Sequence, residues 1–262
     1  MTKTLLESEP PRAQRRRAKV IVVLPAFNEE QNVGPLLDRI ADAMYDEDLP
    51  YEIIVVDDGS VDRTYDVLMG YRDRVPLTVY KHEKNQGLGA TIRDGLFYAS
   101  QKAGDQDTVI TMDADETHTP GLILRMVRMI REGHDVVIAS RYRPGARQFG
   151  LSAFRTFLSF AASWLFRLVF PIPGVRDFTC GYRAYRGSTL KLAISTYGSS
   201  FVDAEGFSCM VDILLKMRNL HLIFGEVPMI LRYDLKQGKS KMNVGRTIRN
   251  TLVLMAKRRI GK

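Results

Sequence analysis

Short apolar runs alternate with amphipathic segments along the first half of the chain. The apolar runs are rich in valine, isoleucine and threonine and have the length of buried strands: 19–24, 51–56, 77–80, 108–112 and 135–139. Between them, apolar side chains recur at helical spacing, as at Val33, Leu36 and Ile40. This alternation predicts an α/β fold with a mostly parallel central sheet and helices on both faces.

Acidic residues stand directly after two of these runs. Asp57 and Asp58 follow the second run, and Asp113 and Asp115 follow the fourth. Open α/β sheets bind ligands at the carboxyl ends of their strands, and carboxylates suit a Mg²⁺ ion shared with substrate phosphates. The Asp113-x-Asp115 pair therefore predicts either a metal-diphosphate site or an acidic turn that caps the next helix.

A glycine-containing loop, Asn-Gln-Gly-Leu-Gly-Ala at 85–90, opens a predicted helix over 90–101. Its two glycines would permit close backbone approach to a phosphate, although such loops are common between strands and helices. The chain has no P-loop and no complete dinucleotide fingerprint. We therefore expect acids, rather than lysines, to meet a bound nucleotide.

Length and cysteine content set the broad class. A chain of 262 residues can form one large domain or two small ones. Its two cysteines, Cys180 and Cys209, are too few for a disulfide framework and lie among apolar residues, which favours a reducing compartment. The first 19 residues have no apolar core segment, so we expect no signal peptide.

The net charge of +8 is concentrated at the two ends of the sequence. Residues 1–20 carry +4 and residues 236–262 carry +9, which leaves −5 between them. Two basic arms suit either a nucleic-acid groove or an anionic membrane surface, where each basic residue contributes about 1 kcal/mol. We expect the first arm, 1–18, to be a disordered tail that is either merely solvated or held at a membrane.

The segment 151–170 would be apolar around most of a helix. Its polar side chains form a narrow strip, made of Ser152, Thr156, Ser159, Ser163 and Arg167. Charged residues leave too short an apolar run to cross a bilayer, so the segment is either an interfacial helix or a buried core helix. A second, basic amphipathic helix is predicted after residue 243, and it would dock on the core or on a membrane.

Basic residues gather in two loops of the second half. Three arginines lie within 141–147, directly after the fifth predicted strand, and a guanidinium binds phosphate oxygens through two parallel hydrogen bonds. A solvated basic loop is the alternative. Lys239 and Lys241, in a Gly-Lys-Ser-Lys segment, could stabilise the negative charge of a departing diphosphate.

Six short motifs occur in the order found in family 2 glycosyltransferases of the GT-A fold. They are Pro25-Ala-Phe-Asn-Glu-Glu30, Val55-Val-Asp-Asp-Gly-Ser60, Asn85-Gln-Gly-Leu-Gly-Ala90, Met112-Asp-Ala-Asp115, Ser140-Arg-Tyr142 and Gly238-Lys-Ser-Lys241. Within the family, the chain most resembles polyprenyl-phosphate sugar transferases such as dolichol-phosphate mannose synthases. The resemblance extends from about residue 19 to residue 243.

The resemblance implies a site for each of two substrates. A nucleotide sugar, GDP-mannose or a UDP-hexose, would be bound by Pro25, Asn28, Glu29, Asp57, Asp58, Asp113 and Ala114. Mg²⁺ or Mn²⁺ would be held by Asp113 and Asp115. A polyprenyl phosphate would be bound by Arg141, Arg183, Lys239 and Lys241. Glu116 and Thr117 depart from the pattern of close relatives, which leaves the third metal contact open.

The implied reaction is an inverting sugar transfer in which Asp115, Arg141, Asp177 and Lys241 take part. The second pKa of a phosphate monoester is about 6, so the acceptor phosphate is mostly ionised when it binds. It therefore needs little proton removal by a base. Asp177 is accordingly expected to position the acceptor, although it could also be a structural turn residue. Asp203 and Glu205 are its rivals for an acidic role.

These expectations divide the chain into 1–18, a tail; 19–145, the donor half; 146–235, the acceptor half; and 236–262, a basic loop and amphipathic helix. The protein would be peripheral on the cytoplasmic face of a membrane, with no transmembrane helix and no nucleic-acid partner. The interpretation leaves room for a small membrane-protein partner. The rival functions are a glycosyltransferase acting on a hydroxyl, a nucleotidyltransferase and a non-catalytic membrane scaffold.

Overall fold

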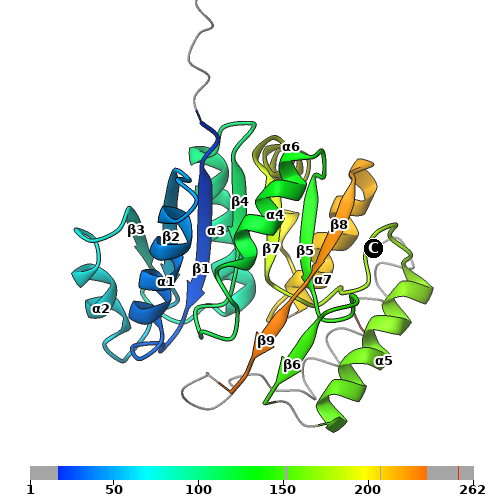
Figure 1. The fold of residues 1–262 in the computed structure, drawn as a ribbon, viewed down its shortest axis with the longest axis horizontal. Coiled ribbons are helices and arrows are strands. Elements are labelled where there is room, and N and C mark those ends of the chain that lie inside the picture. The colour runs from blue at the N-terminus through cyan, green and yellow to red at the C-terminus, as the bar shows by residue number, and fades with distance from the viewer. Residues whose placement is uncertain (1–16, 151–152, 207, 235–252, 254–262) are drawn as a thin grey trace, which may run out of the picture.

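A seven-stranded sheet forms the centre of the protein (Figure 1). The computed structural model describes residues 17–150, 153–206, 208–234 and 253, with the side chains of 153–158 left out. The strands of this sheet are β1 (Val20–Ala26), β2 (Tyr51–Asp57), β3 (Leu77–Lys81), β4 (Thr108–Thr111), β5 (Val136–Ser140), β7 (Arg183–Arg186) and β8 (Phe224–Pro228). They lie in the order β3-β2-β1-β4-β7-β5-β8.

The sheet is mostly parallel, as the alternating pattern predicts. The exception is β7, which lies between β4 and β5 and runs antiparallel to both. Because the chain enters β7 at the edge where β4 and β5 end, the residues just before Arg183 are carried to the carboxyl ends of both strands. The sequence pattern did not predict this strand.

Helices cover both faces of the sheet. Their bounds are α1 (Val33–Tyr45), α2 (Thr64–Gly70), α3 (Leu88–Lys102), α4 (Leu122–Arg131), α5 (Ala153–Val169), α6 (Gly187–Tyr197) and α7 (Ser208–Met217), with 3₁₀ turns η1 (Gly198–Phe201) and η2 (Arg218–Leu220). In Figure 1, α1 and α4 lie in front of the sheet and α3, α6 and α7 behind it. Two covered faces explain why central strands such as β1 and β5 are mostly apolar and almost entirely buried.

The late apolar run divides into two strands. The sequence predicts one strand over 220–231, whereas β8 ends at Pro228 and β9 (Ile230–Arg232) leaves the main sheet. There β9 pairs in parallel with β6 (Arg147–Phe149). A proline has no N–H to donate to a ladder, which accounts for the end of β8 at this position. The small second sheet lies beyond the carboxyl ends of the main strands (Figure 1).

Two residues of the predicted polar strip of α5, Ser159 and Ser163, face the protein. The hydroxyl of Ser159 lies 2.6 Å from that of Tyr142, and buried Ser163 donates to the carbonyl of Arg176. The outer face of α5 carries the exposed Arg167 and four large exposed apolar side chains: Phe160, Trp164, Leu165 and Leu168. Among the described residues, no helix combines the length and the hydropathy that a membrane crossing requires.

Candidate active site

The acidic motifs of the first half meet at one edge of the sheet. β1 lies between β2 and β4, and its last residue, Ala26, pairs with Asp57. Asp113 and Asp115 follow the end of β4 on the other side of β1. The structure thus brings together motifs separated by more than fifty residues, because parallel neighbours end on the same side.

The loops that follow β1 and β2 are joined by hydrogen bonds of residues that were predicted to bind the nucleotide sugar. Asn28, in the left-handed region with φ of 53°, donates its backbone N–H to the Ser60 hydroxyl at 2.9 Å. Its side-chain oxygen accepts from the N–H of Val61, also at 2.9 Å. Asp57 Oδ1 accepts from Ser60 N, whereas its buried Oδ2 accepts no hydrogen bond within the described residues. A ligand donor that reached Oδ2 would remove the free-energy cost of that unsatisfied oxygen.

Asp58 and Glu29 mainly organise these loops. The Asp58 carboxylate accepts from the N–H groups of Gln86 and Gly87, both at 2.8 Å, and lies 2.7 Å from His82 Nδ1. The Glu29 carboxylate accepts from Asn32 at 2.7 Å. These bonds are internal, so both residues shape the walls of the candidate site. Of the other predicted donor residues, Pro25 is half-buried within β1 and Ala114 is buried beside the acidic pair.

The two glycines of the loop before α3 have different roles. A Cβ at Gly89 would lie 2.5 Å from the carbonyl oxygen of Ala204, so this glycine permits one backbone to pass against another. Gly87 has φ of 89°, and a Cβ there would meet nothing within 4 Å. Only Gly87 therefore retains the open surroundings that a phosphate-binding interpretation of this loop requires.

The Asp113-x-Asp115 turn is rigidly held. Asp115 Oδ1 accepts from the backbone N–H and the hydroxyl of Thr117, at 3.2 and 2.7 Å. The N–H of Asp113 donates to His118 Nδ1 at 3.1 Å. Glu116 adopts a left-handed conformation, with φ of 62°, and extends to Arg39 of α1, where the two charged groups are 3.2 Å apart. Glu116 is therefore directed to an ion pair, away from the role of a third metal ligand.

The acidic turn offers the donor atoms that Mg²⁺ or Mn²⁺ prefers. Two carboxylates follow one strand, and about a third of the Asp113 side chain is exposed. No group of three or more His, Cys, Asp or Glu side chains suited to a metal occurs in the described part of the chain. This composition fits an ion that completes its shell with substrate oxygens and water, because Mg²⁺ is commonly held by one or two carboxylates together with phosphates.

The segment 177–183 packs against this turn. The hydroxyl of Thr111 donates to the carbonyl of Gly181 at 2.7 Å, and a Cβ at Gly181 would lie 3.5 Å from Asp113 Oδ1. The Tyr182 ring stacks on His118, with 5.0 Å between their centroids. Its hydroxyl donates to the carbonyl of Thr119 at 3.1 Å. Asp113 and the residues just after the turn thus lie against a segment that comes far later in the sequence.

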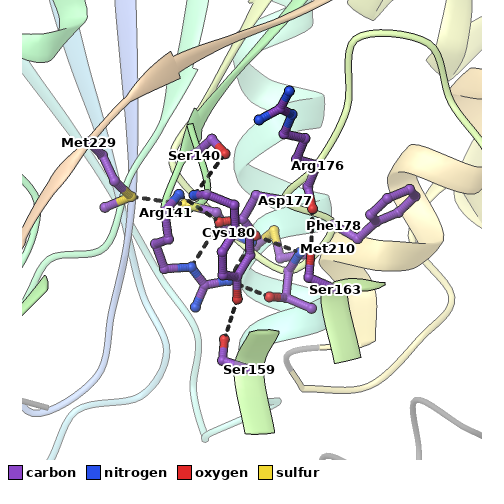
Figure 2. A network of polar contacts seen from close by, with 12 residues as sticks. Ser140, Arg141, Ser159, Ser163, Arg176, Asp177, Phe178, Cys180, Met210 and Met229 are labelled. Carbon is purple, nitrogen blue, oxygen red and sulfur yellow. Dashed lines mark hydrogen bonds and ion pairs between the residues drawn. The ribbon is translucent and has the colours of Figure 1, made fainter. Parts of the chain in front are cut away.

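The same segment holds Arg141. Asp177 accepts from Arg141 Nε at 2.8 Å and from Nη2 at 2.7 Å, and Nη2 also donates to the Thr179 hydroxyl (Figure 2). The Asp177 carboxylate accepts further bonds from the N–H groups of Arg141, Thr179 and Cys180. The Arg141 side chain is 17% exposed. That exposed part is where an anion could meet Arg141.

The ion pair between Arg141 and Asp177 determines the protonation states of both groups. Burial would raise the pKa of Asp177, but the positive charge and hydrogen bonds of Arg141 outweigh it and lower that pKa. Burial alone would lower the pKa of Arg141, but the charge of Asp177 raises it well above its usual value. Both groups are therefore ionised at neutral pH, and Asp177 is poorly suited to accept a proton from a substrate.

Arg183 has a structural role and does not reach the candidate acceptor side. Its side chain is fully buried, and its guanidinium donates to the carbonyls of Phe178, Cys180 and Met210 at 2.7 to 2.9 Å. β7 is covered on both faces, which draws this side chain into the core. The expectation that Arg183 binds an acceptor phosphate does not fit this position. Lys239 and Lys241 lie outside the described residues.

Two residues of the second half were not singled out from the sequence. Glu226 of β8 is buried and accepts from the N–H groups of Arg176 and Asp177. Lys216 of α7 is buried and donates to Asp212 at 2.8 Å and Asp203 at 3.1 Å. The signal for both was a charged residue within an apolar run, because such residues are rarely buried unless they are paired. The Lys216 pair also makes Asp203 a poor candidate for a catalytic base.

Comparisons with known proteins identify the family to which the chain belongs. The family model described as glycosyl transferase family 2 matches residues 21–191. Polyprenol monophosphomannose synthase of Mycolicibacterium smegmatis is 30% identical over 253 residues, which cover 95% of this chain and 89% of that protein. Undecaprenyl-phosphate mannosyltransferase of Micrococcus luteus is 30% identical over 228 residues, covering 87% and 88%. Dolichol-phosphate mannosyltransferase of Pyrococcus furiosus is 30% identical over 231 residues, covering 88% of this chain and only 60% of that longer protein.

Solved structures share the fold at lower identity. Glucosyl-3-phosphoglycerate synthase from Mycobacterium tuberculosis, crystallised with Mn²⁺, UDP and phosphoglyceric acid, matches with a TM-score of 0.66 at 19% identity. The match covers 93% of this chain and 79% of that one. A structure of the same enzyme with Mg²⁺ and UDP gives a TM-score of 0.65 at 18% identity, covering 93% and 80%. At this identity the likeness concerns the fold alone, which is the GT-A arrangement predicted from the sequence.

Proposed function

The chain belongs to glycosyl transferase family 2, and on that premise we propose that it transfers mannose from a nucleotide sugar to a polyprenyl phosphate at a membrane surface. The three relatives at 30% identity are all named as enzymes that form mannosyl derivatives of polyprenyl or dolichol phosphates. Two of them match this chain over most of their own length. The donor, the acceptor and the metal ion are part of this proposal.

The observation that carries the proposal is the position of the segment 177–183. Gly181 lies against Asp113, and Asp177 holds Arg141 through two side-chain hydrogen bonds. A donor diphosphate at the acidic turn and an acceptor phosphate at Arg141 would therefore be neighbours. An enzyme that joins two phosphate-bearing substrates needs separate counter-charges for each of them.

The reaction requires little proton transfer. An ionised phosphate oxygen attacks the anomeric carbon of mannose, the bond from that carbon to the diphosphate oxygen breaks, and the nucleoside diphosphate leaves with the bonding electrons. Arg141 would orient the attacking phosphate, and Asp177 would keep the guanidinium charged and in place. Mg²⁺ or Mn²⁺ held by Asp113 and Asp115 would supply positive charge beside the diphosphate.

The helix α5 would bring the acceptor side to the membrane. Its exposed Phe160, Trp164 and Leu168 form an apolar face, while Ser159 on the opposite side contacts Tyr142, the residue after Arg141. Aromatic and aliphatic side chains on a helix of this kind insert among lipid headgroups. A lipid phosphate bound at Arg141 would then keep its chain in the bilayer.

Liposome flotation tests the membrane contact separately from transfer. Substitution of Phe160, Trp164 and Leu168 together by serine should strongly reduce flotation with anionic vesicles and leave the thermal unfolding temperature nearly unchanged, because these side chains are exposed. Leu192→Ser is the matched control, since Leu192 is an exposed leucine on α6. Equal flotation of the triple variant and this control would contradict a role for α5.

A panel of sugar nucleotides tests the reaction itself. GDP-mannose, UDP-glucose and UDP-N-acetylglucosamine would be incubated with a short-chain polyprenyl phosphate and Mg²⁺ or Mn²⁺. We expect mannosyl transfer to the lipid phosphate and release of a nucleoside diphosphate. Release of pyrophosphate would instead indicate a nucleotidyltransferase, and transfer only to a sugar or lipid hydroxyl would indicate a different acceptor class.

A further inference from the structure

Beneath the Arg141–Asp177 pair lies a second carboxylate that the proposed reaction does not use. Glu226 projects from β8, its side chain is fully buried, and its Oε1 accepts from the N–H groups of Arg176 and Asp177 at 2.5 and 2.7 Å. A buried ionisable group is costly unless it is paired, so a carboxylate at this position calls for an explanation.

The first contact of Glu226 fixes the backbone that carries Asp177. The loop before Asp177 passes close to β8, because a Cβ at Gly174 would lie 2.4 Å from the carbonyl oxygen of Phe224. Glu226 stands two residues further along β8 and receives two consecutive N–H groups of that loop. The direction of the Asp177 side chain, and with it that of Arg141, therefore depends on Glu226.

The second contact involves another arginine. Glu226 Oε2 is buried and accepts no hydrogen bond within the described residues, and Arg143 Nε lies 3.9 Å from it. The Arg143 side chain is 40% exposed, so it can face both this oxygen and a ligand at the surface. Two buried carboxylates, Asp177 and Glu226, are thus matched by two arginines of one loop, Arg141 and Arg143.

We propose that Glu226 is a positioning residue for the acceptor: it holds Arg141 through the backbone of Asp177 and holds Arg143 directly, so that the two guanidinium groups bind one phosphate. Arg143 would then supply the second cationic group, the role that the family resemblance implied for Arg183. This inference rests on the proposed function, since it names further residues for the same acceptor. Burial raises the pKa of Glu226, and hydrogen bonds from the N–H groups of Arg176 and Asp177 and from the Ser140 side chain offset part of that rise.

The substitution Glu226→Gln distinguishes the contact with the backbone N–H groups from the contact with Arg143. Glutamine keeps one oxygen for the two N–H groups, but its neutral amide no longer attracts Arg143. Binding of a short-chain isoprenyl phosphate, measured by calorimetry without donor, should weaken about tenfold, while the affinity for the nucleotide sugar stays unchanged. Arg143→Gln should weaken acceptor binding to a similar degree. The double variant should be no weaker than Arg143→Gln alone, because both changes remove the same interaction.

Arg74→Gln is the matched control, since Arg74 forms an exposed ion pair with Asp38 away from this network. Its binding of both substrates should equal that of the wild type. An unchanged acceptor affinity in Glu226→Gln would overturn the inference. So would equal losses of donor and acceptor affinity together with a large fall in unfolding temperature, because that pattern indicates a purely structural residue.

The binding experiment also distinguishes this inference from the proposed function. A wild-type protein that binds isoprenyl phosphate but transfers no sugar to it would contradict the proposed function alone. In that case, weaker binding by Glu226→Gln and Arg143→Gln would still support the assignment of the phosphate site. A wild-type protein that does not bind the phosphate would overturn both.

Discussion

The proposed donor side and the proposed acceptor side of this protein satisfy their buried charges by different means. On the donor side, Asp58 and Asp115 accept hydrogen bonds mainly from nearby backbone N–H groups, a hydroxyl and a histidine. On the acceptor side, Asp177 is paired with the guanidinium of Arg141, and Glu226 lies near Arg143. The first site contains mainly carboxylates, whereas the second contains arginines beside its carboxylates.

This difference accords with the chemistry proposed for each side. A diphosphate bound beside carboxylates requires a divalent cation to offset the repulsion between negative groups. A phosphate monoester can instead be bound by arginines without a metal, provided that other charges hold those arginines in place. The segment 177–183 contacts both regions, because Gly181 lies against Asp113 and Asp177 binds Arg141.

The largest expected effect comes from removing a charge on the acceptor side. Asp177→Asn should destabilise the protein by about 3–5 kcal/mol, because the guanidinium of Arg141, whose side chain is only 17% exposed, would lose its charged partner. Urea unfolding measures this loss. The double substitution Arg141→Met with Asp177→Asn should recover part of it, since no unpaired charge would then be buried.

The stability difference between the wild type and Asp177→Asn should depend on pH. The folded-state pKa of Asp177 is lowered, so its stabilising contribution is present above the unfolded-state pKa of about 3.9 and is lost as pH falls through the lower folded value. The gap in stability between wild type and Asp177→Asn should therefore narrow below pH about 4. A constant gap across this range would show that the lost stability has another origin.

On the donor side, a matching change should affect activity more than stability. Asp115→Asn keeps an oxygen that can accept from Thr117 but loses the negative charge proposed to hold the metal. Metal-dependent transfer should fall by roughly 100-fold or more, with an unfolding temperature close to that of the wild type. Near-normal turnover in this variant would contradict the assignment of the acidic turn.

A smaller effect is expected where backbone packing alone is disturbed. Gly89→Ala places a methyl group against the Ala204 carbonyl and should cost about 1–3 kcal/mol of stability. Gly70→Ala, at the end of α2 with nothing within 4 Å of the added Cβ, should be neutral or slightly stabilising. Equal stabilities of the two variants, measured by chemical unfolding, would show that the backbone at Ala204 moves away from the added methyl group without loss of stability.

The sequence predicts the donor side more fully than the acceptor side. The strands up to β5 and the acidic motifs at their ends are local features, and parallel pairing brings those ends together. The mostly parallel α/β sheet, the GT-A fold and membership of the family were all predicted correctly. The roles of the individual site residues stay predictions.

Less of the acceptor side could be predicted, because its contacts join distant parts of the chain. Glu226 and Asp177 are 49 residues apart, and no periodic pattern specifies that they meet. The insertion of β7 between β4 and β5 decides that Arg183 is buried, and that strand was not predicted from the sequence. A helical wheel of α5 shows its polar strip but cannot indicate that Ser159 and Ser163 face inward.

Transfer kinetics of Arg141→Gln most directly test whether one segment joins a donor site to an acceptor-phosphate site. Donor and acceptor concentrations would be varied separately, and nucleotide-sugar affinity would be measured by calorimetry. The KM for polyprenyl phosphate should rise at least about tenfold while donor affinity stays within error of the wild type. An unchanged acceptor KM, or an equal loss of affinity for both substrates, would contradict the assignment of Arg141 to the acceptor.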